Sequence, residues 1–172
     1  MNVRFLNPFV DAANEVLQAE VGASITRGSL SLQKSAMTAD DITVLLSLVG
    51  QVQGVALFGM SIATGLTLVS KVMAQEFTEF DSLAQSGIAE LGNVITGRAS
   101  VKLAEAGYVS TISPPTLLAG KGATISTLDF ARLIVPLHGD DGAVIIHLAL
   151  REGVDRGRDA AAISVPARPA HP

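Results

Sequence analysis

Glu90 and Asn93 are the two residues of this chain whose types and spacing could do chemistry. On a helix, residues at positions i and i+3 lie side by side on one face. A carboxylate forms charge-assisted hydrogen bonds with cations, and an amide can both donate and accept hydrogen bonds. Ser86 lies one helical turn before this pair and Pro115 follows farther along, which gives the pattern Ser86-x3-Glu90-x2-Asn93 with a later proline.

The segment that carries the pair has the pattern of one helix, from Asp81 to Ala106. At about 100° per residue, its apolar residues fall on one stripe. They are Ala84, Ile88, Leu91, Ile95 and Ala99. The residues that fall roughly opposite are Ser86, Glu90, Asn93 and Gly97. We therefore expect the acid and the amide to point away from the core, where they can act on another molecule.

The composition favours one globular domain and excludes several classes of protein. The 172 residues are enough for one substantial core and few for two. A net charge of -4 without a basic cluster argues against a nucleic-acid surface. The absence of cysteine excludes disulfides and thiolate metal sites, and the three histidines show no metal-ligand spacing. The first residues lack the apolar run of a signal peptide, so we expect a cytoplasmic protein.

Residues 42–70 contain no charged side chain, and a run of that length could cross a bilayer. Gly50-Gln51-Val52-Gln53-Gly54 interrupts the run with turn-forming residues and two glutamines. The flanking segments, Ile42–Val49 and Val55–Ser61, have the length and the β-branched content of strands. We therefore expect a buried hairpin followed by a buried helix rather than a membrane span.

The remaining segments show helix and strand patterns. Helices are expected at Asn7–Ala19, with Asn7 as the N-cap and Gly22 beyond the end, and at Ile62–Gln75. Strands are expected at Ser24–Ser35, Asp41–Val49, Val52–Ser61, Tyr108–Ser113, Asp129–His138 and Ala143–Arg151. Asp140 and Asp141, between glycines, predict a tight turn that joins the last two strands.

These elements predict a single α/β domain, residues 5–151, with helices packed on a largely antiparallel sheet, and a disordered tail, residues 152–172. The domain also divides into two similar halves, each a helix followed by three strands. In the first helix, Asn7-x3-Asp11-x2-Asn14 is a degenerate copy of the second-half pattern, because Asp replaces Glu and Ala36 stands where the proline would be. Only the second half keeps the full pattern.

The pattern at Ser86, Glu90, Asn93 and Pro115 resembles that of the CheC/CheX/FliY phosphatases of bacterial chemotaxis. The order of elements across the domain resembles the same family, including the internal repeat. One intact pattern rather than two resembles CheX more than CheC. The resemblance implies a phosphatase that hydrolyses the aspartyl-phosphate of a CheY-type response regulator, and a homodimer joined through edge strands.

For such a reaction the main task is to place a water molecule in line with the phosphorus. Asn93 would orient this water, and Glu90 would pair with a lysine beside the partner's phosphorylated aspartate. Ser86, Ala89, Gly97 and Pro115 would lie at the contact with the partner, since the small side chains allow close approach. The chain needs no cofactor of its own, because the resemblance places the divalent metal, Mg²⁺, on the response regulator.

Two alternatives stay open. The same helix face could dock a response regulator or a flagellar switch component without hydrolysing anything. A small-molecule enzyme could instead use the glycine-rich loop at Ala119–Ala123, although Gly120-Lys121-Gly122 lacks the other residues of a phosphate loop. That enzyme would need a convergent polar pocket beside the loop.

Overall fold

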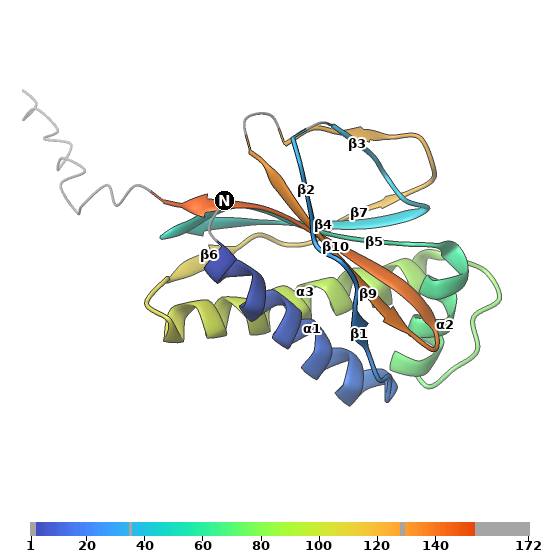
Figure 1. Ribbon diagram of the computed structural model, residues 1–172. Helices are drawn as coiled ribbons and strands as arrows, with labels where there is room; N and C mark the ends of the chain where they lie inside the picture. Colours follow the sequence, from blue (N-terminus) through green and yellow to red (C-terminus); the bar gives the residue numbers. More distant parts are fainter. Residues whose placement is uncertain (1–2, 35, 128–129, 154–172) are drawn as a thin grey trace, which may run out of the picture.

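The computed structural model of the chain describes residues 3–34, 36–127 and 130–153, and its helices lie on one face of an antiparallel sheet (Figure 1). The described helical elements are a 3-10 turn η1 (Val3–Phe5) and the helices α1 (Leu6–Val21), α2 (Ile62–Val72) and α3 (Ser82–Glu105). Helix α3 packs along α1 and contacts α2 and the sheet. The expected arrangement of helices on a largely antiparallel sheet is confirmed.

Ten strands lie within the described residues: β1 (Thr26–Arg27), β2 (Ser31–Gln33), β3 (Met37–Thr38), β4 (Ile42–Gly50), β5 (Val52–Met60), β6 (Ser110–Ile112), β7 (Thr116–Ala119), β8 (Thr124–Ile125), β9 (Arg132–Gly139) and β10 (Gly142–Glu152). The main sheet runs in the order β1-β9-β10-β5-β4-β6. Strand β2 also pairs with β9, and β7 also pairs with β4. Strands β3 and β8 form a separate two-stranded sheet.

The strand pairings are symmetric between the two halves of the chain. Exchanging β1–β5 with β6–β10, in order, turns every described pairing into another described pairing or into itself. The central pair, β5 with β10, and the small pair, β3 with β8, are each formed by one strand from each half. Each half contains five strands rather than the three expected, since strands of two to four residues leave almost no period-2 pattern.

The ends of the helices follow the expected signals in part. The Oδ1 of Asp81 accepts a hydrogen bond of 2.8 Å from the backbone N–H of Ala84, so this residue caps α3. Gly22 ends α1 in the left-handed conformation, with φ of 65°. The expected N-cap at Asn7 is wrong, because η1 leads directly into α1 and Phe5 occupies the cap position.

The long strands and their turns follow the expectations closely. The uncharged run forms the β4–β5 hairpin and α2, and no helix in the described part of the chain is long and apolar enough to span a membrane. Asp140 and Asp141 form the tight turn between β9 and β10, and Asp141 also pairs with Lys71 of α2 at 2.6 Å. Of the tail expected at 152–172, residues 154–172 lie outside the described part.

The core fills the space between the sheet and the helices. The expected stripe of α3, Ala84, Ile88, Leu91, Ile95 and Ala99, is buried throughout. Gly92 lets α3 sit close to the sheet, because a Cβ there would lie 2.8 Å from the Cγ1 of Val44. The stripe therefore fixes which face of α3 turns outward.

Two basic side chains are buried on the other face of the sheet. His147 of β10 alternates with core residues Ile146 and Leu148, so it points away from the helices. It is 6% exposed, and neither ring nitrogen has a hydrogen-bond partner among the residues that the structure describes. Burial, together with the nearby charge of Arg132, lowers the pKa of His147 from 6.5 to about 4. The imidazole is therefore neutral at physiological pH.

Candidate functional site

The outward face of α3 presents Glu90 and Asn93 next to each other. Glu90 is exposed and Asn93 is half-buried. The Nδ2 of Asn93 donates a hydrogen bond of 3.3 Å to the Oε2 of Glu90. Since the carboxamide is planar, this bond turns the amide oxygen away from the carboxylate and leaves it able to accept a hydrogen bond. The structure thus brings the predicted pair together and gives the amide a defined orientation.

The other predicted contact residues surround this pair. Ser86 is exposed, and its hydroxyl donates a hydrogen bond of 2.9 Å to the backbone oxygen of Ser82, one helical turn earlier. Ala89 and Gly97 are half-buried on the same helix. Gly97 lies beside Ile112 of β6, since a Cβ on the glycine would be 3.9 Å from the isoleucine Cδ1.

Pro115 comes from a different part of the chain than the helix. It is half-buried in the connection between β6 and β7, and both of these strands contact α3. Ser100 of α3 also donates a hydrogen bond of 3.1 Å to the backbone oxygen of Ser110 in β6. The connection that carries the proline therefore runs beside the helix that carries the pair.

A groove that the sequence did not reveal adjoins the pair on the side of α2. It has a volume of about 350 Å³, and we call it the α2–α3 groove. Its lining is mainly apolar: Val72 and Met73 at the end of α2, and Leu83, Gly87, Leu91 and Val94 of α3. Glu20, Ser86 and Glu90 complete the lining. Glu90 thus belongs both to the predicted pair and to this groove.

The degenerate copy of the pattern lies on the exposed surface of α1. Asn7, Asp11 and Asn14 are all exposed. The neighbouring Glu15 forms an ion pair of 2.6 Å with Lys102 of α3, and this contact raises the pKa of the lysine, with a smaller contribution from Asp11. The first copy therefore differs from the second both in its residues and in having a lysine beside it.

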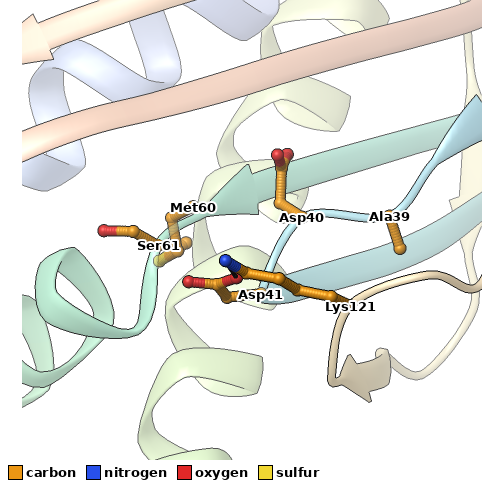
Figure 2. Close-up of a pocket in the computed structure, with 6 residues that line it drawn as sticks. All are labelled: Ala39, Asp40, Asp41, Met60, Ser61 and Lys121. Atoms are coloured by element: carbon orange, nitrogen blue, oxygen red, sulfur yellow. Dashed lines mark ion pairs between the residues drawn. The ribbon is translucent and has the colours of Figure 1, made fainter.

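A second pocket, of about 410 Å³, lies at the start of α2 and is lined in part by Asp40, Asp41, Ser61 and Lys121 (Figure 2). It provides an acid pair beside the glycine-rich loop that the sequence did not indicate. Asp41 accepts a hydrogen bond of 3.2 Å from the backbone N–H of Ile62 and pairs with Lys121 at 3.3 Å. These contacts lower the pKa of Asp41, whereas burial and the Asp41 charge raise that of Asp40.

The roles of these residues are mostly structural. Asp41 holds the first turn of α2, and its ion pair engages the only cation of the glycine-rich loop. Within the described residues, no group of three or more His, Cys, Asp or Glu side chains could hold a metal ion. The Glu90–Asn93 pair is therefore the stronger candidate for chemistry.

Residues 42–138 match the family model described as "Chemotaxis phosphatase CheX". The chain belongs to the CheX family. The matched region includes Glu90, Asn93 and Pro115, while α1 with the degenerate copy precedes it. The resemblance of the sequence to this family is thereby confirmed.

Relatives and solved structures agree with this CheX assignment. The chain is 25% identical over 155 residues to the CheY-P phosphatase CheX of Thermotoga maritima, covering 89% of this chain and 99% of that protein. A CheC-like superfamily protein from Shewanella sp. PV-4 has a TM-score of 0.80 and 27% identity, covering 88% of this chain and 99% of that one. A chain of the CheX–CheY–BeF3–Mg²⁺ complex from Borrelia burgdorferi has a TM-score of 0.75 and 30% identity. The match covers 88% of this chain and 100% of that one.

Proposed function

We propose that this CheX-family protein hydrolyses the aspartyl-phosphate of a CheY-type response regulator, with Asn93 and Glu90 as its working residues. The observation that carries the proposal is the hydrogen-bonded pair on the outer face of α3, in which Glu90 is exposed and Asn93 half-buried. Family membership supports the phosphatase activity, and the Thermotoga relative is named a CheY-P phosphatase. The Borrelia neighbour was solved together with CheY.

Asn93 would orient the attacking water by hydrogen bonds and would not act as a general base, because a carboxamide is neutral. Its amide oxygen accepts a hydrogen bond from the water, and its second N–H can reach a phosphoryl oxygen. The water oxygen forms a bond to phosphorus while the bond from phosphorus to the aspartate oxygen breaks. The aspartate leaves as a carboxylate, and a proton of the water ends on the released phosphate. Positioning is the main contribution, since an acyl phosphate already has a good leaving group.

Glu90 would have two tasks at once. One carboxylate oxygen accepts a hydrogen bond from the amide of Asn93 and so fixes which end of the carboxamide faces the water. The carboxylate can at the same time pair with a lysine beside the partner's phosphorylated aspartate, and such a contact is charge-assisted. The response regulator would supply the divalent metal that balances the phosphoryl charge, so this chain contributes no metal ligand.

A homodimer through edge strands is part of the proposal. All three residues of β2 are exposed, and its Leu32 is 58% exposed at one edge of the sheet. An open edge with apolar side chains favours pairing with another chain. Light scattering of the wild type and of Leu32→Lys tests this, since the substitution should shift a dimer towards monomer. We also place the protein in the cytoplasm, where response regulators act.

The deciding experiment is release of inorganic phosphate from a phosphorylated CheY-type protein. The wild type should accelerate it, and Asn93→Ala should lose the acceleration while keeping its thermal stability. Binding of a beryllofluoride-activated regulator without acceleration by the wild type would favour the alternative, a non-catalytic docking module. If the wild type neither binds the regulator nor accelerates phosphate release, the proposal is overturned.

A further inference from the structure

The α2–α3 groove leaves apolar side chains facing solvent next to Glu90. Leu83 is 45% exposed and Val94 is 39% exposed, and both line the groove. Val72 and Met73 on the opposite side are half-buried. A concave apolar patch of this kind is typical of a place where another molecule packs.

Gly87 makes the close approach of α2 and α3 possible at this point. A Cβ at Gly87 would lie 2.6 Å from the Cγ2 of Val69 and 3.0 Å from the Sδ of Met73. With no side chain there, the end of α2 rests directly on α3. The two helices therefore lie in close contact along this side of the groove.

The groove is continuous with the proposed catalytic surface. Ser86 and Glu90 line it, and Asn93 is hydrogen-bonded to Glu90. A protein that brings a phosphoryl group to Asn93 and a lysine to Glu90 has to lie over this part of α3. Its surface beside the phosphorylated aspartate then also covers the groove.

The charges around the groove are of one sign. The ionisable residues that line it are Glu20 of α1 and Glu90 of α3, and both are acidic. An acidic border around an apolar floor complements a partner surface with an apolar side chain flanked by basic groups. Such a central apolar anchor usually carries much of the binding energy of a protein interface.

We propose that the α2–α3 groove binds an apolar side chain from the loops that surround the phosphorylated aspartate of the response regulator. This inference rests on the proposed function, because it names a second contact of the same partner. The groove supplies affinity and register, whereas Asn93 supplies the chemistry. Glu20 then forms a second contact with a basic group of the regulator, beyond the lysine held by Glu90.

The test is a matched pair of substitutions on the outer face of α3. Val94→Glu places a charge in the groove, and Val101→Glu places the same charge two turns away, outside it. Val101 is 55% exposed, so both substitutions are on the surface and should leave the fold intact, which thermal unfolding checks. Leu83→Glu provides a second charge in the groove, in case Val94→Glu unfolds.

Affinity is measured with a CheY-type regulator activated by beryllofluoride and Mg²⁺, and turnover with the phosphorylated form. Val94→Glu and Leu83→Glu should weaken binding at least tenfold and raise KM, with kcat kept near wild type. Val101→Glu should stay within twofold of wild type on both measures. If Val94→Glu and Val101→Glu weaken binding equally, the inference is overturned, since the effect would then come from the added charge on α3 and not from the groove.

The outcomes also separate this inference from the proposed function. If Asn93→Ala abolishes turnover but the groove variants bind normally, the groove inference fails and the phosphatase function stands. If the wild type neither binds nor hydrolyses, both fail. If Val94→Glu dissociates a homodimer without changing the affinity for the regulator, the groove binds a second copy of the chain and the inference is overturned.

Discussion

The Nδ2 of Asn93 lies 3.3 Å from the Oε2 of Glu90, one helical turn away on the outer face of α3. The carboxylate therefore decides which end of the carboxamide faces a bound partner. This contact involves no residue outside the helix, so the geometry of the pair depends on α3 alone. Its consequence is that the two residues can be tested separately without disturbing the core.

Replacing Asn93 by Ala should remove the group that orients the attacking water. We expect turnover of the phosphorylated regulator to fall by about 100-fold or more, the range seen when a reacting group loses its position. Affinity for the beryllofluoride-activated regulator should change little. Phosphate release and a binding titration measure the two effects, and a variant with wild-type turnover would remove Asn93 from the mechanism.

Glu90→Gln and Glu90→Ala should separate the two tasks of the acid. The glutamine keeps an oxygen that accepts from the Asn93 amide but loses the charge, so KM should rise while kcat falls little. The alanine loses both, so kcat should fall as well. Steady-state kinetics with increasing salt checks this, because the wild type should lose affinity with salt more steeply than Glu90→Gln. Identical kcat values for the two variants would argue against a positioning role.

Gly97→Ala should make the protein more stable and less active. The position is inside α3, and among the described residues the new methyl group would meet only the Cδ1 of Ile112, at 3.9 Å. Replacing glycine by alanine inside a helix contributes about 0.5–1 kcal/mol to stability. The same methyl group stands on the face that we expect to approach the partner, so KM should rise. Denaturant unfolding and kinetics on one preparation measure both effects.

Gly92→Ala is the matched control for that substitution. It lies on the same helix but faces the sheet, where a Cβ would be 2.8 Å from the Cγ1 of Val44. We expect a loss of about 1–3 kcal/mol from overpacking despite the better helix propensity. If the two substitutions change the free energy of unfolding equally, Gly92 does not lie against the sheet as described.

His147 should make the stability of the fold depend on pH. Its pKa is about 4 in the folded protein and 6.5 when exposed, so between these values only the unfolded chain binds the proton. Stability should therefore fall as the pH drops from about 6.5 towards 4, by roughly 2 kcal/mol at pH 5. Denaturant unfolding at pH 7.5 and pH 5 measures this loss. In His147→Leu the loss should be smaller by that amount, and an equal loss in both proteins would contradict the prediction.

Elements with a long periodic pattern of apolar residues were predictable from the sequence. The apolar stripe recurs along α3, a helix of 24 residues, and the predicted start at Asp81 is the residue that caps it. The β4–β5 hairpin and the Asp140–Asp141 turn follow from long apolar runs around turn-forming residues. The outward direction of Glu90 and Asn93 was therefore predictable, because it depends only on which face of one helix is apolar.

Features formed by distant segments were not predictable in this way. Strands β3 and β8 have two residues each and exist because they pair with each other, which local patterns cannot show. The α2–α3 groove requires the end of α2 to pack on Gly87. The sequence around Gly87 does not indicate which helix packs there. The expected N-cap at Asn7 is wrong because the preceding 3-10 turn, and not a capping side chain, leads into α1.

The exchange symmetry of the sheet has a consequence for how the chain is made. The central partners of the sheet, such as Gly59 with Ile145 and Val52 with Glu152, come from opposite halves of the domain and lie far apart in sequence. During synthesis, the first half therefore emerges with the inner edge of β5 uncovered, and it stays uncovered until β10 is translated. Pairings so far apart in sequence fold slowly and leave apolar strands open to aggregation. A truncated chain ending after α3 should consequently need a chaperone or a second copy to remain soluble.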